Sequence, residues 1–140
     1  PQQIVHAGYE GNWVKQDWIG SYNLGNTPIW DSAVGFHKNM YIKDQFMCLS
    51  FQQKKALPIG KGGAILLSEK EDYEVLKRMA WDGRDASKSV VEDLPNIILG
   101  YHMNMTPDDA AKGLLLLNQY RSSNNHQGTW LDYPNLELAE

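Results

Sequence analysis

Two short apolar runs, residues 46–51 and 64–67, flank a polar connection that ends in glycines. Apolar runs of this length are typical of buried strands. The connection carries Lys54 and Lys55, and its glycines permit backbone conformations that other residues resist. The pattern therefore predicts two strands joined by a loop that holds a lysine amine near a serine hydroxyl. A lysine held in this way can condense with a carbonyl group if burial or neighbouring cations lower its pKa.

The composition limits the classes of protein to which the chain can belong. Its 140 residues are 42% hydrophobic and 21% charged, which indicates one folded domain and not a disordered segment. The net charge of -4 offers no basic surface for nucleic acid, and the single cysteine, Cys48, fits a reducing compartment. No apolar run reaches membrane-spanning length, and no set of His, Cys or carboxylate residues has the spacing of a metal site. We therefore expect a cytoplasmic protein with neither a nucleic-acid nor a membrane partner.

Strands are also expected in the first quarter of the chain. Short apolar segments at residues 3–6 and 27–33 have the length of strands. The second would deliver Asp31 to its C-terminal end, where open α/β sheets place their ligand sites. A helix is expected after Asn12, because apolar residues then recur at four-residue spacing. Residues 86–96, which are charged and polar, are expected to form a surface loop.

Two helices are expected in the second half of the chain. The run Ser68–Glu71 has the pattern of a capping box that begins the first helix, and Gly83 would end it. Thr106, followed by a proline and two aspartates, has the pattern of a second helix start. This second helix would run over residues 108–120. Its Leu114–Leu117 run is apolar around most of the helix, so we expect it to be buried in the core or against a second subunit.

The run Ser50-Phe51-x-x-x-Lys55, followed by Gly60-x-Gly62-Gly63, resembles the cofactor-lysine loop of the DegT/StrS family of pyridoxal-phosphate (PLP) sugar aminotransferases. In that family a Ser-Phe-x-x-x-Lys run precedes Gly-Glu-Gly-Gly at the same offset. The match selects Lys55 and not Lys54, since only Lys55 has the family's spacing to both the serine and the glycines. Taken alone, a Lys-Lys pair would indicate a surface hairpin with two solvated lysines.

The resemblance implies roles for four residues. Lys55 would bind PLP covalently and, once displaced by the amino donor, carry a proton between the substrate Cα and the cofactor C4′. Asp31 would pair with the pyridine nitrogen and keep the ring protonated, although alone it would be assigned to a helix cap or a turn. Ser50 would contact the cofactor phosphate. His102 lies in Leu99–Thr106, which is similar to a family segment that crosses the dimer interface, and it replaces an asparagine that supports the partner's cofactor phosphate.

The resemblance also implies a fold and an activity. The expected fold is α/β, part of the large domain of a fold-type I PLP-dependent transferase, with a mostly parallel sheet and flanking helices. Residues 1–120 would form this partial domain and residues 121–140 a C-terminal tail, without the family's small domain. The implied enzyme is a homodimer that transfers an amino group, usually from glutamate, to a nucleotide-linked keto sugar.

Departures from the family pattern keep alternatives open. Val34 stands where the family has a glutamine that reaches the cofactor's phenolic oxygen, Asn104 replaces an arginine, and Lys61 replaces a glutamate. A non-catalytic remnant that serves as a folding or dimerisation module, which Val34, His102, Asn104 and the truncation favour, is the alternative. A dehydratase relative, which has histidine in place of the lysine, is opposed by Lys55.

The beginning of the chain carries a further expectation. It starts at Pro1 without a methionine, which indicates a piece of a longer protein or an incomplete reading frame. In the family, the preceding segment supplies a phosphate-cradling loop and an aromatic residue that stacks on the cofactor. We therefore expect the isolated chain to be inactive and to bind PLP weakly or not at all.

Overall fold

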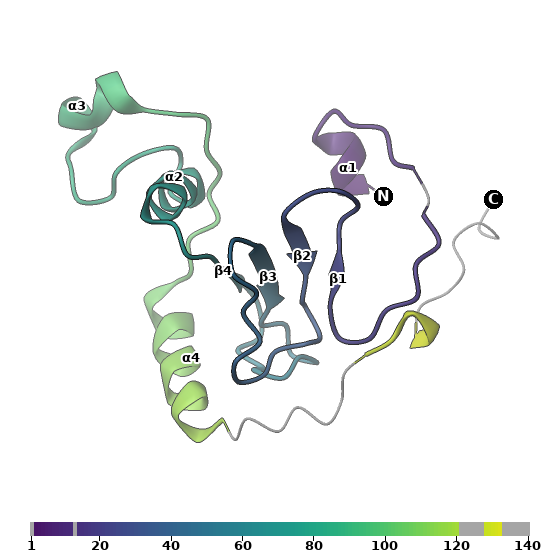
Figure 1. The fold of residues 1–140 in the computed structure, drawn as a ribbon. Coiled ribbons are helices and arrows are strands. Elements are labelled where there is room, and N and C mark those ends of the chain that lie inside the picture. Colours follow the sequence, from purple (N-terminus) through teal and green to yellow (C-terminus); the bar gives the residue numbers. More distant parts are fainter. Residues whose placement is uncertain (1, 13, 121–127, 133–140) are drawn as a thin grey trace.

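The computed structural model describes residues 2–12, 14–120 and 128–132, which form a small sheet with helices around it (Figure 1). In chain order the elements are α1 (Gln2–His6), β1 (Tyr22–Asn23), β2 (Ile29–Asp31), β3 (Phe46–Ser50), β4 (Gly63–Leu66), α2 (Lys70–Ala80), α3 (Val90–Asp93), the 3₁₀ turn η1 (Leu94–Asn96), α4 (Pro107–Gln119) and the 3₁₀ turn η2 (Trp130–Asp132). The predicted α/β class is confirmed.

The four strands lie in chain order across the sheet, β1-β2-β3-β4. Only the β2–β3 pair is parallel, whereas β1–β2 and β3–β4 are antiparallel. Within these strands the sheet is therefore mixed and not mostly parallel as expected. The reason is local: β4 follows β3 through a loop whose two ends are hydrogen-bonded to each other, and strands joined in this way run antiparallel. The strands predicted around residues 27–33 and 46–51 are confirmed with shorter bounds, and the one predicted at 64–67 is confirmed with its bounds shifted by one residue.

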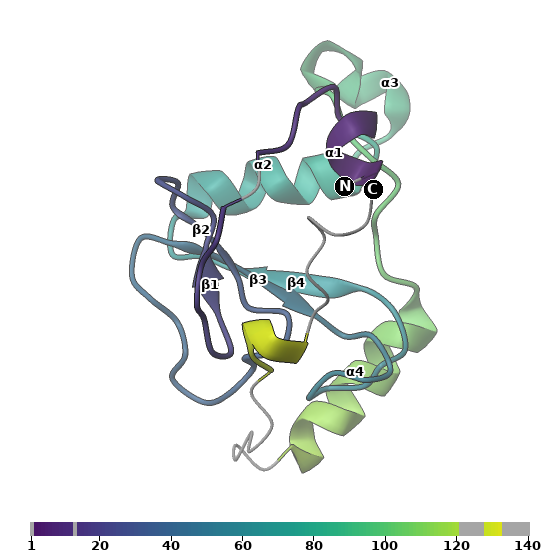
Figure 2. The same cartoon turned by 90° about the vertical axis from the view of Figure 1, so that its right-hand side faces the viewer.

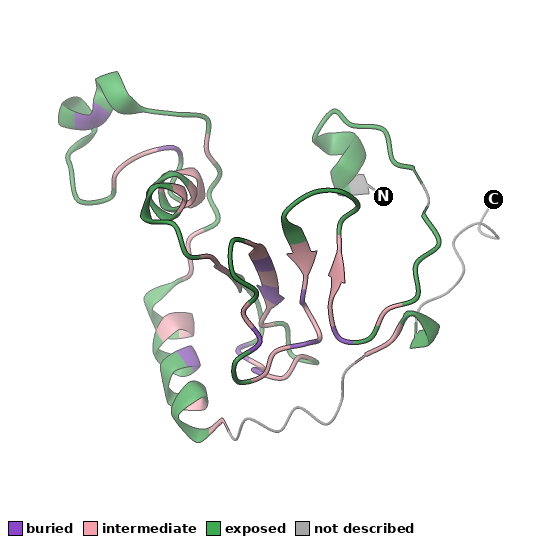
Figure 3. Ribbon diagram, in the orientation of Figure 1, coloured by how far each residue is buried: buried purple, intermediate pink, exposed green. Residues whose placement is uncertain are grey.

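Burial alternates along β3 and separates the two faces of the sheet. Met47 and Leu49 are buried, whereas Phe46, Cys48 and Ser50 are half-buried. Because successive side chains of a strand point to opposite faces, these two sets lie on opposite sides. The core forms on the Met47 face, from residues that share it or pack against it: Met40, Trp30, Phe36, Tyr41, Phe51, Ala64 and Leu66. Figure 3 shows that burial is concentrated in the strands and the loops next to them.

Helices α2 and α4 lie on either side of the sheet, above and below it in Figure 2. The start of α4 agrees with the prediction, since the Thr106 hydroxyl accepts a hydrogen bond from the Asp109 amide. The capping box predicted at Ser68 is wrong. The N-cap is Glu69, which makes no side-chain cap, and the Ser68 hydroxyl donates instead to the Glu69 carboxylate. At the other end of α2 the Gly83 amide donates to the Arg78 carbonyl, and the glycine has the expected positive φ of 79°.

Two backbone segments, one containing Gly83 and the other Gly100, cross at the end of α2. An ideal Cβ on Gly83 would overlap the Ile98 carbonyl oxygen, and one on Gly100 would overlap the Gly83 amide nitrogen. Backbone hydrogen bonds join the same segments, from the Asp82 amide to the Tyr101 carbonyl (3.0 Å) and from the Ile98 amide to the Gly83 carbonyl (3.1 Å). Both glycines are therefore required by the close approach of two backbones.

Three further expectations are wrong. Residues 3–6 lie in α1 and not in a strand, because a short apolar run satisfies either pattern. No helix follows Asn12 among the described residues before β1, because Tyr22 pairs with Asp31 in the sheet and tertiary pairing overrides local spacing. Residues 86–96 contain α3 and η1, and α3 begins with a capping box formed by Ser89 and Glu92.

Most of the Leu114–Leu117 run is not buried within the chain. Leu114 and Leu115 are each 65% exposed and Leu117 is 46% exposed, so the expectation of burial in the core is wrong. The alternative expectation, burial against a second subunit, stays a prediction. The predicted tail falls largely on residues 121–127 and 133–140, which lie outside the described part of the chain. Among the described helices, none is long and apolar enough to cross a membrane.

Candidate functional site

Asp31 and Ser50 end two neighbouring parallel strands, and thus lie at the same edge of the sheet. Asp31 is the last residue of β2 and is the register partner of Cys48 on β3. Ser50 follows two residues after Cys48 and ends β3. Since side chains repeat every second residue along a strand, the three side chains share the face opposite the core. This placement follows from the alternation of β3 and from the parallel β2–β3 register.

The carboxylate of Asp31 is fixed by two donors. The Tyr22 hydroxyl donates to Oδ2 (2.8 Å), and the Ala33 amide donates to Oδ1 (2.9 Å). Tyr22 stands opposite Asp31 in the antiparallel β1–β2 pair, so its ring lies on the same face. Sequence reasoning missed Tyr22 as a site residue because the helix expected after Asn12 would have included this tyrosine on its apolar face. No local pattern marks a two-residue strand, so the tyrosine could not have been found in that way.

A pocket of about 210 Å³ opens over Asp31, lined by Trp18, Tyr22, Asp31, Ala33 and Val34. The rings of Trp18 and Tyr22 lie with their centroids 4.9 Å apart. An ionised carboxylate has about four acceptor positions, so Asp31 can accept a further hydrogen bond beside the two that it makes. A flat heteroaromatic ring with a protonated nitrogen suits such a lining, because aromatic and aliphatic walls contact its faces and the carboxylate its N–H.

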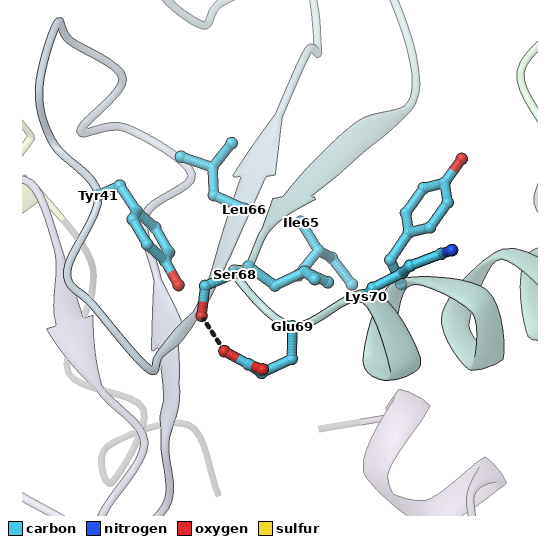
Figure 4. Close-up of a pocket in the computed structure, with 8 residues that line it drawn as sticks. Tyr41, Ile65, Leu66, Ser68, Glu69 and Lys70 are labelled. Atoms are coloured by element: carbon cyan, nitrogen blue, oxygen red, sulfur yellow. Dashed lines mark hydrogen bonds between the residues drawn. The ribbon is translucent and has the colours of Figure 1, made fainter.

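A larger hollow of about 490 Å³ lies at the start of α2 (Figure 4). Its lining includes Tyr41, Ile65, Ser68, Glu69 and Lys70, and the Ser68 hydroxyl donates to the Glu69 carboxylate across 3.0 Å. The lining contains none of the four residues predicted from the sequence. The smaller pocket is therefore the one that belongs to the candidate site.

The surroundings of Cys48 on this face of the sheet change the pKa of its thiol. Burial raises the pKa of Cys48, and the neighbouring carboxylate of Asp31 raises it further. Both effects disfavour the thiolate, the first by desolvation and the second by repulsion between like charges. The raised pKa leaves less of the Cys48 thiol in its reactive, deprotonated form than in an ordinary cysteine.

Lys55 lies in a closed loop, residues 51–62, which we call the lysine loop. The neck of the loop is held by two hydrogen bonds, from the Phe51 amide to the Gly62 carbonyl and from the Gly60 amide to the Phe51 carbonyl, each 2.9 Å long. Lys55 ends a tight turn, in which its amide donates a hydrogen bond to the Gln52 carbonyl (2.9 Å). The Gln52 amide in turn donates to the Ser50 hydroxyl at 3.4 Å. One short stretch of backbone thus connects the ends of the predicted Ser-x-x-x-x-Lys motif.

Two of the loop's apolar side chains anchor it. Leu57 is 5% exposed and Ile59 is 4% exposed, whereas Lys55 itself is half-buried. Two positive-φ glycines, Gly60 (127°) and Gly62 (84°), turn the chain back toward β4. Ordinary residues adopt such angles only with strain, which explains why the sequence pattern has glycines there.

His102 lies apart from this edge of the sheet, at the end of α2. It forms an isolated bridge with Trp81, and its Nδ1 lies 3.1 Å from an Asp82 carboxylate oxygen. Within the described part of the chain, no hydrogen bond or ion pair directly joins any two of the side chains of Asp31, Ser50, Lys55 and His102. The structure therefore brings Asp31 and Ser50 to one edge, starts the lysine loop from that edge, and leaves His102 elsewhere. The roles assigned to the four residues stay predictions.

In the described part of the chain, no group of three or more His, Cys, Asp or Glu residues could hold a metal ion. The groups with polar chemistry near this edge are the Asp31 carboxylate, which lines a partly apolar pocket, the Ser50 hydroxyl at the end of β3, and the Lys55 amine in the loop that follows. These are groups that can bind a ring and a phosphate and can move a proton.

Comparisons with known proteins give the family. A solved structure from Bacillus cereus, assigned as a PLP-dependent aminotransferase, is similar to this chain with a TM-score of 0.52 and 26% sequence identity. The likeness covers 64% of this chain and 24% of that one, so the chain spans about a quarter of its solved relative. No curated protein gives a significant match. The sequence model of the DegT/DnrJ/EryC1/StrS aminotransferase family matches residues 36–140, which include Ser50, Lys55 and His102 but not Asp31. With three quarters of its length matched, the chain belongs to the DegT/DnrJ/EryC1/StrS aminotransferase family.

Proposed function

We propose that the chain is part of a PLP-dependent aminotransferase in which Lys55 and Asp31 act on one cofactor ring. The observation that carries this proposal is the edge formed by β2 and β3, where Asp31 lines a pocket and β3 leads directly into the lysine loop. Following the family resemblance, the amino donor is glutamate, the acceptor is a nucleotide-linked keto sugar, and the whole enzyme is a cytoplasmic homodimer.

The residues present at this edge fit such a cofactor. When bound, PLP supplies an electron sink for the bond broken at the substrate Cα. Asp31 would hold a proton on the ring nitrogen, because its carboxylate is fixed by two donors and retains acceptor capacity. Ala33 and Val34 would contact the ring as apolar neighbours in the same pocket. The Lys55 amine would bind the aldehyde group of PLP and would then carry the proton between the substrate and the cofactor.

The two remaining predicted residues would act on the phosphate. The Ser50 hydroxyl accepts a long hydrogen bond from the Gln52 amide (3.4 Å), which leaves its own proton available for a phosphate oxygen. His102, at the end of α2, would serve the partner's phosphate only in a homodimer. In that role its ring would exchange its present contact with Asp82 for one with the phosphate.

Reductive trapping tests the proposal with a matched control within the motif. The purified chain is incubated with excess PLP, reduced with borohydride so that any lysine–aldehyde linkage becomes a stable amine, and digested for peptide mapping. Because reduction captures even weak binding, we expect the label to concentrate on Lys55. Lys55→Ala should lose it, and Lys54→Ala should keep it.

The opposite result is equally clear. Label that is spread evenly over the surface lysines, or that is lost in Lys54→Ala and retained in Lys55→Ala, would contradict the proposed role of Lys55. An absorbance scan before reduction gives a second readout, since lysine-bound PLP absorbs at longer wavelength than the free aldehyde.

A further inference from the structure

Helix α4 contacts the lysine loop at three points, although the two are distant in sequence. Lys112 donates a hydrogen bond from Nζ to the carbonyl oxygen of Ile59. Gly113 lies directly against the Ile59 side chain, because an ideal Cβ at this glycine would be 2.7 Å from Ile59 Cδ1. Lys61 Nζ forms an ion pair with Asp109 at 3.4 Å. All three contacts are to the returning half of the loop.

The contacts differ in how strongly they restrain the loop. The Lys61 side chain is 70% exposed, so its ion pair with Asp109 is screened by water and contributes little. The Lys112 side chain is exposed as well, but its hydrogen bond ends on the main-chain carbonyl of Ile59, a residue that is 4% exposed, and therefore restrains the backbone itself. Beside it, buried Gly113 allows α4 to approach closely enough for Ile59 to pack on it. Lys112 and Gly113 thus carry most of the restraint.

Helix α4 is itself held in place, so it can act as a fixed support. Beyond its last turn the Tyr120 hydroxyl donates to the Phe36 carbonyl (2.7 Å), and the two rings lie 5.1 Å apart. Phe36 packs against the hydrophobic core on the Met47 face of the sheet. At its other end, Met105 precedes the helix and lies close to Gly62, at the neck of the loop.

We propose that Lys112 is a positioning residue, which holds the lysine loop through Ile59 and thereby fixes Lys55 relative to Ser50 and Asp31. The route from Lys112 to Lys55 is short. Lys112 donates to the Ile59 carbonyl, and the next amide along the chain, that of Gly60, donates to the Phe51 carbonyl. Within the same loop the Lys55 amide donates to the Gln52 carbonyl. The consequence for Lys55 chemistry rests on the proposed function, whereas the restraint on the loop does not.

Hydrogen exchange of single amides tests the restraint without any cofactor. The variants are Lys112→Met, which keeps the length of the side chain but has no donor, and Lys112→Arg, which restores a donor. Asn118→Met is the control, a polar-to-methionine change at an exposed position on the same helix. In Lys112→Met we expect exchange at the amides of Lys55 and Gly60 to become about tenfold faster, the factor that loss of a charged hydrogen bond implies. Exchange in β3 should not change, and Lys112→Arg should return the loop amides toward the original rates.

Reductive labelling by PLP then tests the effect on Lys55. The ratio of label on Lys55 to label on Lys54 should fall in Lys112→Met, recover in Lys112→Arg, and be unchanged in Asn118→Met. Unchanged loop exchange in Lys112→Met, or equally faster exchange throughout the sheet, would overturn the restraint. Faster loop exchange with an unchanged labelling ratio would overturn the positioning role. A wild-type chain without preference for Lys55 would contradict the proposed function, and the exchange rates would still decide the restraint.

Discussion

Because Gly113 packs on Ile59, we expect replacement of this helical glycine by alanine to destabilise the chain, which is the opposite of the usual effect. Replacing an interior helical glycine by alanine ordinarily stabilises a helix by about 1 kcal/mol. Here the new methyl group would lie 2.7 Å from Cδ1 of Ile59, a side chain that is only 4% exposed. Overpacking of this kind costs about 1–3 kcal/mol. We therefore expect Gly113→Ala to lower the free energy of unfolding by up to about 2 kcal/mol.

A second substitution separates the steric cost of the new methyl group from the gain in helix stability that alanine brings. Ile59→Val removes the methyl group that the new side chain would meet, and alone such a change costs about 0.5–1.5 kcal/mol. In the double variant the alanine methyl can occupy the vacated space. The double variant should therefore be more stable than the sum of the single changes predicts, by about 1–2 kcal/mol.

Urea unfolding of the four proteins measures this coupling, provided that the slope against urea concentration is the same in all four. The reasoning is refuted if Gly113→Ala stabilises the chain by the full helical gain. It is also refuted if the two changes are additive to within about 0.5 kcal/mol. Either result would mean that α4 does not pack on the lysine loop as the structure has it.

Three other predictions concern different parts of the molecule. Gly100→Ala should prevent the two backbones from crossing at the end of α2, so we expect loss of the cooperative unfolding transition of the wild-type chain. Asp31→Asn should lower the pKa of Cys48 toward its ordinary value, since it removes a neighbouring charge, and the pH dependence of thiol alkylation would measure the change. Hydrogen bonds from the side chain and amide of Ser87 are the main reason that the pKa of Asp85 falls from 3.8 to about 2. Because a depressed pKa stabilises the folded state above the unfolded-state value, this contribution should be complete above about pH 4 and be lost as the pH falls through 2. Urea unfolding of the wild-type chain and of Asp85→Asn should accordingly converge over that range, and a difference that is independent of pH would contradict the assignment.

The elements that sequence reasoning predicted correctly are those with a strong local signal. The Thr106 hydroxyl and the following proline specify the start of α4 without help from the rest of the fold. Strands β3 and β4 are short apolar runs on either side of a polar connection that ends in glycines, a pattern that arises from their own composition. Helix α3 could have been predicted as well, because Ser89 and Glu92 have capping-box spacing, but the polar composition of the segment favoured a loop.

The features that could not be predicted depend on contacts between distant segments. Tyr22 meets Asp31 only because a two-residue strand pairs there, and no residue pattern specifies so short an element. Lys112 occupies a position on α4 whose sequence neighbours give no sign of the Ile59 carbonyl that it binds. The placement of Asp31 at a strand end was predictable, whereas the tyrosine that fixes it and the helix that restrains the lysine loop required the structure.

The central claim is that Lys55 and Asp31 serve the same ring, and one measurement tests it directly. After reductive labelling, the pyridoxyl group is attached irreversibly to Lys55, and the pKa of its ring nitrogen can be followed by absorbance in the wild-type chain and in Asp31→Asn. If the carboxylate faces that nitrogen, the ring should stay protonated to higher pH in the wild-type chain, because an adjacent negative charge favours the protonated ring. Identical titrations in the two proteins would contradict the claim.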